Sequence, residues 1–167
     1  VGLGGNVGKS FAMQVAENDF DYYVLELSSF QLDGMYEFKA DIAVLLNITP
    51  DHLDRYEYKL ENYADSKFRI IQNQTEQDAF IFCVDDEVTM QTIKNKQVKA
   101  KQYPISIKQI VETGAHLENN QLIINTNNTN PLFMTIQELA LQGKHNIYNS
   151  MAAGVTGKLV GIRKETI

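Results

Sequence analysis

The chain has 167 residues and a hydrophobic content of 44%, which is enough for one domain with a real hydrophobic core. The net charge of −6 argues against a nucleic-acid-binding groove, and a single cysteine, Cys83, excludes an internal disulfide and fits a reducing cytoplasm. No apolar run approaches the roughly 20 residues that a membrane-spanning helix needs.

The beginning of the chain contains a glycine-rich sequence, GGNVGKS at residues 4–10, that lacks the spacing of a phosphate-binding P-loop. The pattern G-x-x-x-x-G-K-[ST] would need a glycine at position 3, where the chain has Leu3. We therefore predict a turn between a strand and a short helix over residues 10–18, with Asn6 able to face an anionic ligand. A GTP-binding regulatory domain that uses this loop remains the alternative from a different functional class.

Two apolar runs that predict buried strands, residues 21–27 and 41–46, each end in polar residues. Glu26 lies at the end of the first run, and His52 follows the second run within the sequence NITPDHLDRY. Ligands of open α/β sheets bind just beyond the carboxyl ends of the strands. We therefore expect this carboxylate and this imidazole to lie at one edge of a sheet.

A helix is predicted over residues 60–73, with Lys67 on its otherwise apolar stripe. A lysine in such a position usually extends its ammonium group to water. The alternative is a desolvated amine that reacts with CO2 to form a carbamate, which could bind a divalent metal together with Glu26 and His52. The residues alone leave both interpretations open.

The second half of the chain predicts further strands. Residues 78–84 form a buried strand that contains Cys83, and acidic residues 85–87 begin a short helix that ends near residue 94. Residues 98–103 predict an edge strand, because lysines alternate along them. Short strands within residues 115–135 predict an antiparallel meander. The fold class is therefore α/β, a mostly parallel sheet flanked by helices with a small appended meander.

Near the C-terminus, residues 141–150 lead into a helix of small residues. Asn146 and Asn149 are three positions apart, so they share one face near the start of that helix. The same spacing also allows one of them to be a simple helix N-cap.

Four sequence blocks, within residues 4–153, resemble the central ATP-binding domain of the Mur ligases, bacterial enzymes that build the peptidoglycan stem peptide. The blocks are ELSSFQL (26–32), NITPDHLDRY (47–56), YADSK (63–67) and GKHN (143–146) with Asn149. The ELSSFQL block most resembles the member that adds D-glutamate to UDP-N-acetylmuramoyl-L-alanine. Another Mur ligase or a folylpolyglutamate synthase would share the Asp-His and lysine blocks but should lack ELSSFQL.

The resemblance implies a P-loop-like core and a cytoplasmic, ATP-dependent ligase that works through an acyl phosphate and Mg²⁺. The ligase would be monomeric when full length, with no nucleic-acid or membrane partner. The resemblance also implies these roles: Mg²⁺ ligands at Glu26, His52 and Lys67, the last as N6-carboxylysine; substrate contacts at Asn6, Ser28 and Gln31; and adenine contacts at Asn146 and Asn149.

The chain departs from the family pattern at its beginning. The ATP loop of the family, G-T-x-G-K-[ST], does not occur in the sequence, and Lys9 only imitates it. We expect residues 1–167 to be a single domain, a fragment of the central domain truncated at its N-terminus. The N-terminal UDP-binding and C-terminal ligase domains would lie outside it, and the fragment alone would be inactive.

Overall fold

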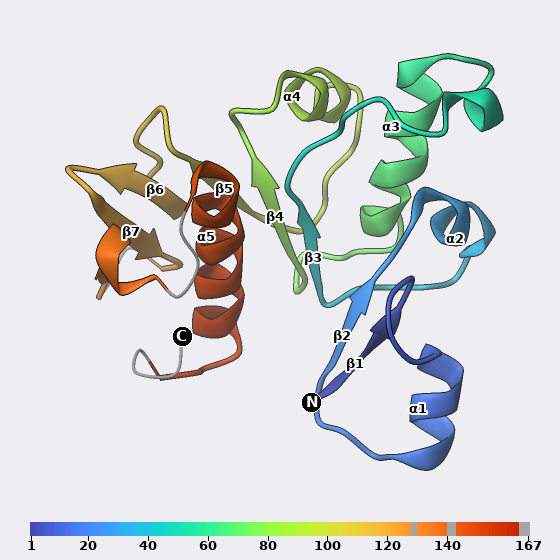
Figure 1. The fold of residues 1–167 in the computed structure, drawn as a ribbon, viewed down its shortest axis with the longest axis horizontal. Coiled ribbons are helices and arrows are strands. Elements are labelled where there is room, and N and C mark those ends of the chain that lie inside the picture. The colour runs from blue at the N-terminus through green and yellow to red at the C-terminus, as the bar shows by residue number, and fades with distance from the viewer. Residues whose placement is uncertain (128–129, 140–142, 164–167) are drawn as a thin grey trace.

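The computed structural model describes residues 1–127, 130–139 and 143–163, and it contains two β-sheets with helices packed around them (Figure 1). The strands are β1 (Gly2–Gly5), β2 (Tyr23–Glu26), β3 (Ile42–Leu45), β4 (Ala79–Cys83), β5 (Lys101–Ser106), β6 (Gly114–Glu118), β7 (Gln121–Asn125) and β8 (Leu132–Thr135). The α-helices are α1 (Phe11–Glu17), α2 (Ser29–Gly34), α3 (Leu60–Phe68), α4 (Glu87–Ile93) and α5 (Lys144–Leu159). Three short 3₁₀ turns complete the elements: η1 (Leu53–Tyr56), η2 (Arg69–Ile71) and η3 (Ile136–Glu138).

The larger sheet has the strand order β3-β4-β5-β6-β7-β8. Its strands are parallel from β3 to β6, whereas β6, β7 and β8 pair antiparallel. Strands β1 and β2 form a separate parallel pair. The predicted α/β class, with a mostly parallel sheet and an appended antiparallel meander, is confirmed.

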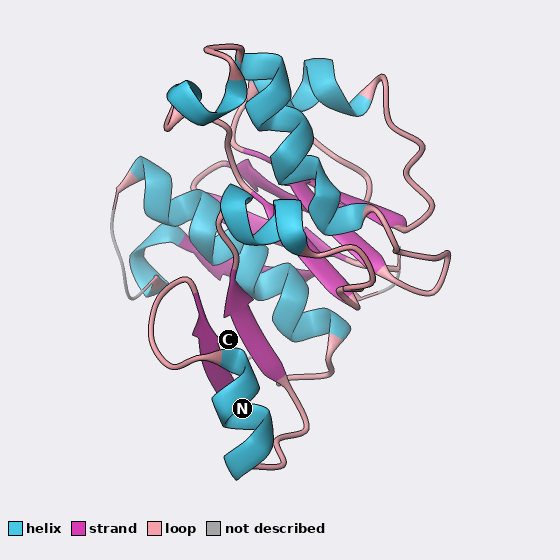
Figure 2. Ribbon diagram, turned by 90° about the vertical axis from the view of Figure 1, so that its right-hand side faces the viewer, coloured by secondary structure: helices cyan, strands magenta, loops and turns pink. Residues whose placement is uncertain are grey.

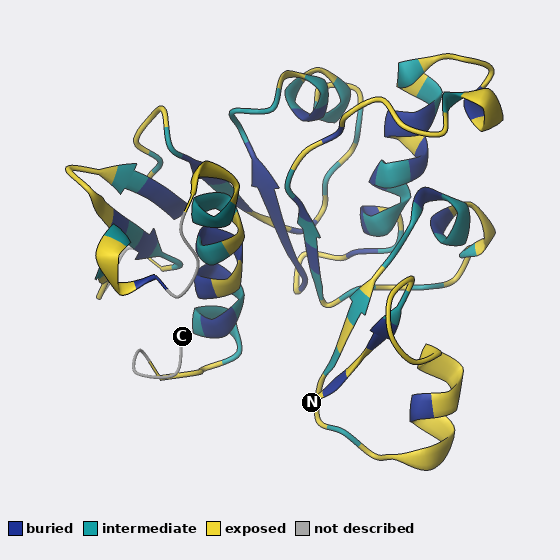
Figure 3. Cartoon of the chain, in the orientation of Figure 1, coloured by how far each residue is buried: buried dark blue, intermediate teal, exposed yellow. Residues whose placement is uncertain are grey.

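Side chains of β4 alternate between two hydrophobic cores, one on each face of the larger sheet. Figure 2 shows the helices packed around the sheets, and Figure 3 shows β4 in the colour of buried residues. Ile81 and Cys83 pack with residues of α5, while Phe80 and Phe82 pack with residues of α3 and α4. Every residue of β4 is buried, as expected for a parallel strand with helices on both faces. Cys83 is thus the predicted core thiol, and burial raises its pKa.

The prediction of an edge strand at residues 98–103 is wrong. The strand β5 begins at Lys101 and lies between β4 and β6, in the interior of the sheet. Its last four residues, 103–106, are mostly buried, and the alternating lysines lie before the strand or at its first residue. The prediction failed because the lysines that suggested an edge strand lie directly before the buried part of β5.

The helix predicted at residues 60–73 is shorter than expected, because α3 ends at Phe68 and continues as the 3₁₀ turn η2. Within the described ranges, no helix has both the length and the apolar character needed to cross a membrane.

Candidate functional site

His52 lies in the loop that follows β3, with its backbone in the left-handed conformation (φ 49°). The loop is held on both sides of the histidine. The Ile48 N–H donates to Asp86 Oδ2 at 3.3 Å, and the His52 carbonyl accepts from the Arg55 N–H at 3.0 Å. A non-glycine residue keeps such a conformation only where its surroundings impose it. The loop therefore presents an imidazole that is largely exposed to solvent.

Glu26 is the last residue of β2, and the glycine-rich turn after β1 holds it. The Asn6 backbone N–H donates to the Glu26 carbonyl at 2.6 Å, and the Asn6 side-chain amide donates to Glu26 Oε1 at 3.2 Å. Gly5 makes this approach possible, because its φ is +107° and a Cβ there would lie 2.2 Å from the Glu26 carbonyl oxygen. The predicted strand–turn–helix is confirmed, and Asn6 has a protein contact that the sequence did not predict.

Ser28 and Gln31 form a capping box at the start of α2. Ser28 Oγ accepts from the Gln31 backbone N–H at 3.3 Å, and Gln31 Oε1 accepts from the Ser28 backbone N–H at 3.0 Å. This reciprocal arrangement satisfies backbone donors at the first turn of a helix. Ser28 is therefore the N-cap, and the box fixes both residues shortly after the strand that ends in Glu26.

Lys67 lies in the last turn of α3 and is half-buried. Its Nζ is 5.5 Å from the centre of the Tyr63 ring, one helical turn earlier, which is within the range of a cation–π contact. Tyr63 itself is buried in the core on that face of the sheet. Lys67 thus lies on the apolar side of the helix, as predicted, with its amine above an aromatic ring.

A row of aromatic rings connects these separate segments. The Phe30 ring lies 5.1 Å from the His52 ring and stacks on Tyr56 at 6.3 Å, and Tyr56 contacts Tyr63 at 5.3 Å. The row therefore runs from the ELSSFQL segment past His52 to the helix that carries Lys67. Sequence reasoning assigned no role to Phe30 or Tyr56, although both lie within the quoted motifs.

The donor chemistry of this region suits a magnesium ion that also binds a phosphorylated ligand. Among the described residues, no group of three His, Cys, Asp or Glu side chains is gathered closely enough to hold a metal ion. Protein sites for Mg²⁺ commonly supply only one or two ligands and leave the rest to water and substrate phosphates. The exposed carboxylate of Glu26 fits that pattern, and the exposed imidazole of His52 could add one nitrogen ligand.

Asn146 and Asn149 lie in the first two turns of α5, on the opposite face of the larger sheet from Lys67 (Figure 1). Asn149 Nδ2 donates to Asn146 Oδ1 at 3.3 Å, so the predicted shared face is confirmed. The N-cap of α5 is Gly143, with a φ of 106°, so neither asparagine is the helix cap. The adjacent Tyr148 hydroxyl donates to Asp85 Oδ2 at 2.7 Å, which places this end of α5 beside the carboxyl end of β4.

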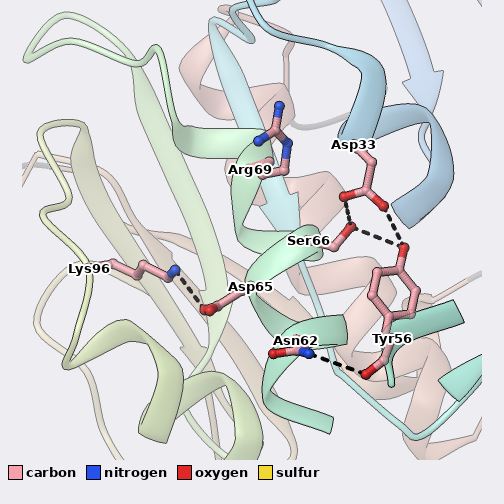
Figure 4. A pocket seen from close by; sticks show the side chains of 7 residues that line it. All are labelled: Asp33, Tyr56, Asn62, Asp65, Ser66, Arg69 and Lys96. Carbon is pink, nitrogen blue, oxygen red and sulfur yellow. Dashed lines mark hydrogen bonds and ion pairs between the residues drawn. The ribbon is translucent and has the colours of Figure 1, made fainter. Parts of the chain in front are cut away.

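A polar hollow of about 450 Å³ lies next to α3 (Figure 4). The residues that line it are Asp33, Tyr56, Asn62, Asp65, Ser66, Arg69 and Lys96. Its two cations already have partners, because Lys96 pairs with Asp65 at 2.7 Å and Arg69 Nε donates to the Leu32 carbonyl at 2.7 Å. None of the predicted site residues lines this hollow.

Comparisons with known proteins agree with the geometry. Residues 6–157 match the family model for the Mur ligase middle domain. The chain is 54% identical over 166 residues to the UDP-N-acetylmuramoylalanine–D-glutamate ligase of Christiangramia forsetii, and 53% identical over 169 residues to that of Bacteroides thetaiotaomicron. These alignments cover 99% and 100% of this chain but only 37% of each relative. The chain therefore spans a little over a third of the length of these relatives.

Solved structures show the same fold at much lower sequence identity. A UDP-N-acetylmuramoyl-L-alanyl-D-glutamate–2,6-diaminopimelate ligase superposes with a TM-score of 0.60 at 21% identity, over 84% of this chain and 30% of that one. MurF from Acinetobacter baumannii superposes with a TM-score of 0.60 at 14% identity, over 98% of this chain and 43% of that one.

Proposed function

The chain belongs to the Mur ligase family, as its middle domain, and from this premise we propose that it is the central part of a longer ATP-dependent ligase. The proposed reaction is the addition of D-glutamate to UDP-N-acetylmuramoyl-L-alanine, in bacterial peptidoglycan synthesis in the cytoplasm. The chain is more than 50% identical, over almost its whole length, to ligases named for D-glutamate. This identity supports D-glutamate over the amino acids that other members of the family add. The UDP-binding and amino-acid-binding domains would lie outside the present chain.

The contact between Phe30 and His52 carries the proposal. Their ring centres are 5.1 Å apart, although the residues follow two different strands in two different sheets. The contact brings the ELSSFQL segment beside the Asp-His segment, as one reaction centre requires. Asp86 supports the arrangement, because it binds the loop of His52 from the carboxyl end of β4.

In the proposed site, Glu26 would hold one Mg²⁺ ion next to the ATP phosphates, and His52 together with Lys67 as a carbamate would hold a second one. Bound Mg²⁺ would offset the negative charge that gathers when ATP and a carboxylate approach each other. The Asn6 amide would keep the Glu26 carboxylate oriented through its hydrogen bond. Asn6, Ser28 and Gln31 would also contact the muramoyl-alanine part of the substrate, and the amide nitrogen of Gln31 suits this role because the capping box uses its oxygen. Asn146 and Asn149 would contact the adenine.

The proposed chemistry has two steps. A carboxylate oxygen of the alanine attacks the γ-phosphorus of ATP, the bond from that phosphorus to the bridging oxygen breaks, and ADP leaves. The neutral amine of D-glutamate then attacks the acyl carbon of the acyl phosphate, loses a proton, and displaces inorganic phosphate as the amide forms. The residues of this chain contribute mainly by positioning and by compensating charge, which are the dominant effects in phosphoryl transfer.

The carbamate at Lys67 forms without another enzyme, because a neutral amine adds to CO2 and releases a proton. The position of Lys67 supports it, because the side chain is half-buried and its Nζ lies 5.5 Å from the centre of the Tyr63 ring, partly shielded from bulk water. Native mass spectrometry in bicarbonate should show a labile gain of one CO2 that disappears in Lys67→Ala. An unchanged mass in wild type would show that Lys67 carries no carbamate. That result would not bear on the proposed roles of the other site residues.

The function is tested with the full-length protein that contains this segment. Incubation with ATP, Mg²⁺ and UDP-N-acetylmuramoyl-L-alanine should form amide product with D-glutamate, and not with L-lysine or diaminopimelate as the amino acid. Conversion of one of those amino acids instead would assign the chain to another member of the family. The present chain alone should give no turnover, because it spans only 37% of the length of the ligases it matches.

A nucleotide titration tests the alternative, a GTP-binding regulatory domain. The turn at residues 4–10 is closed by a hydrogen bond from the Gly5 N–H to the Lys9 carbonyl at 3.3 Å, and the Asn6 N–H in this turn binds the Glu26 carbonyl. Tight binding of Mg-GTP by the chain would favour that alternative, whereas a preference of the full-length protein for Mg-ATP would support the ligase.

A further inference from the structure

The side chains of Asp33, Tyr56 and Ser66 form a hydrogen-bonded cluster (Figure 4). The Tyr56 hydroxyl donates to Asp33 Oδ2 at 2.9 Å, and Ser66 Oγ donates to Asp33 Oδ1 at 2.7 Å. The two hydroxyls are also within 3.2 Å of each other, and Ser66 Oγ lies 3.0 Å from the Ser29 carbonyl. One carboxylate thus receives a hydroxyl on each of its oxygens, and hydrogen bonds to a charged acceptor are the stronger kind.

Each member of the cluster comes from a different element and lies near a proposed site residue. Asp33 is in α2, two residues after Gln31. Tyr56 ends η1, the turn that begins directly after His52, and Ser66 immediately precedes Lys67 in α3. The cluster therefore joins the three segments that carry the proposed site.

The ring of Tyr56 extends this connection to the site residues. It stacks on Phe30 with an angle of 5° between the ring planes, and Phe30 contacts His52. Tyr56 also contacts Tyr63, edge to face, and the Lys67 amine lies over the Tyr63 ring. A displacement of Tyr56 would therefore reach both His52 and Lys67 through van der Waals contact.

We propose that Asp33, Tyr56 and Ser66 are positioning residues that fix the separation of His52 and Lys67, so that both can bind one divalent cation. This inference rests on the proposed ligase function and its metal site. Residues that support metal ligands from behind commonly change metal affinity or activity by about 10- to 100-fold when they are replaced. The hydroxyl of Tyr56 is the central member, because it joins the carboxylate to the stacked rings.

Two substitutions test the proposal without removing a buried hydrophobic group. Tyr56→Phe keeps the stacked ring and deletes only the hydroxyl, and Asp33→Ala deletes both acceptors at an exposed position. Tyr58→Phe and Glu37→Ala are the matched controls, since both are exposed residues close in sequence to the substituted ones. Each variant is made in the full-length protein, in bicarbonate buffer.

Binding of Mn²⁺ is measured by electron paramagnetic resonance, the melting temperature is measured without metal, and turnover is measured as a function of Mg²⁺ concentration. We expect Tyr56→Phe and Asp33→Ala to raise the dissociation constant for Mn²⁺, and the Mg²⁺ concentration for half-maximal rate, by roughly tenfold, with both controls at the wild-type values. Turnover of the variants should recover at high Mg²⁺.

The outcomes separate the inference from the function on which it rests. If wild type forms the amide product but both variants bind Mn²⁺ as wild type does, the cluster is only structural and the inference is wrong while the ligase proposal stands. A lower melting temperature with unchanged Mn²⁺ binding leads to the same conclusion. If wild type neither binds Mn²⁺ nor forms product, the proposed function itself fails and the inference falls with it.

Discussion

Asp85 and Asp86 are neighbours in the chain, yet their side chains bind opposite parts of the protein. Asp86 is the N-cap of α4 and also binds the loop of His52 through the Ile48 N–H. Asp85 instead accepts hydrogen bonds from the hydroxyls of Ser106 and Tyr148, both at 2.7 Å. The sequence predicted only the helix start, because charge at a helix N-terminus can be inferred locally and partners many residues away cannot.

The pKa of Asp85 leads to a prediction about acid stability. Burial opposes the charge of this carboxylate, but hydrogen bonds from Ser106, Tyr148 and the Ile107 N–H outweigh burial and lower its pKa below the usual range. A lowered pKa in the folded state means that the stabilisation is complete above the unfolded pKa, about 3.9, and is lost as the pH falls through the folded pKa. Asp85→Asn should therefore lower the unfolding free energy by about 1–3 kcal/mol at pH 7.

Urea denaturation at several pH values checks this expectation. The difference in unfolding free energy between wild type and Asp85→Asn should shrink as the pH falls below about 4, where the wild-type carboxylate becomes protonated. Asp19→Asn, at an exposed position, is the control and should show little difference at any pH. A difference that stays constant down to acidic pH would mean that the charge of Asp85 contributes nothing.

Among the elements, the pairing of β5 with β6 depends on one glycine. Gly114 has a φ of +98°, and a Cβ at this position would lie 1.9 Å from the Pro104 carbonyl oxygen. Gly114→Ala should therefore lower the unfolding free energy by about 3 kcal/mol, from backbone strain and from displacement of β6.

A second glycine provides the control for this experiment. Gly34, at the end of α2, does not have a positive φ. Apart from its chain neighbours and the backbone of its own helix, no heavy atom of the described residues lies within 4 Å of the position that a Cβ would take there. Gly34→Ala should therefore be neutral or stabilise by up to about 1 kcal/mol. Thermal or urea denaturation measures both changes. Equal effects of the two substitutions would show that the close approach of β6 to β5 is not a constraint on stability.

The elements also show what the sequence could and could not predict. Hydrophobic runs identified β2, β3 and β4, because their burial depends on local composition. The position of β5 inside the sheet was missed, since the lysines precede a mostly buried stretch that is only four residues long. The row of rings from His52 to Tyr63 was also missed, because ring contacts between separate elements leave no periodic pattern in the sequence.

Across the whole molecule, the small sheet of β1 and β2 exposes apolar side chains to solvent. Leu3 and Val24 are paired in register, and they are 67% and 55% exposed. Such neighbouring apolar residues commonly mark a surface that another part of a protein covers. This exposure supports the proposal that the chain belongs to a longer ligase.

Replacement of these two residues should therefore affect the longer protein more than the present chain. Leu3→Thr with Val24→Thr should change the unfolding free energy of the chain by less than about 1 kcal/mol, since both positions are exposed in it. In the full-length protein the same two substitutions should lower the unfolding free energy by at least about 2 kcal/mol, as expected for buried apolar groups. Equal small effects in both proteins would mean that this surface stays exposed.

We propose that this chain carries the reaction centre of a ligase that activates a carboxylate by phosphorylation. This proposal is tested most directly with the full-length protein and UDP-N-acetylmuramoyl-L-alanine labelled with oxygen-18 in its carboxylate. With ATP, Mg²⁺ and D-glutamate, we expect the released inorganic phosphate to carry the heavy oxygen in proportion to the amide formed, with no transfer in His52→Ala. Release of unlabelled phosphate would show that water, and not the carboxylate, attacks ATP, and it would contradict the account.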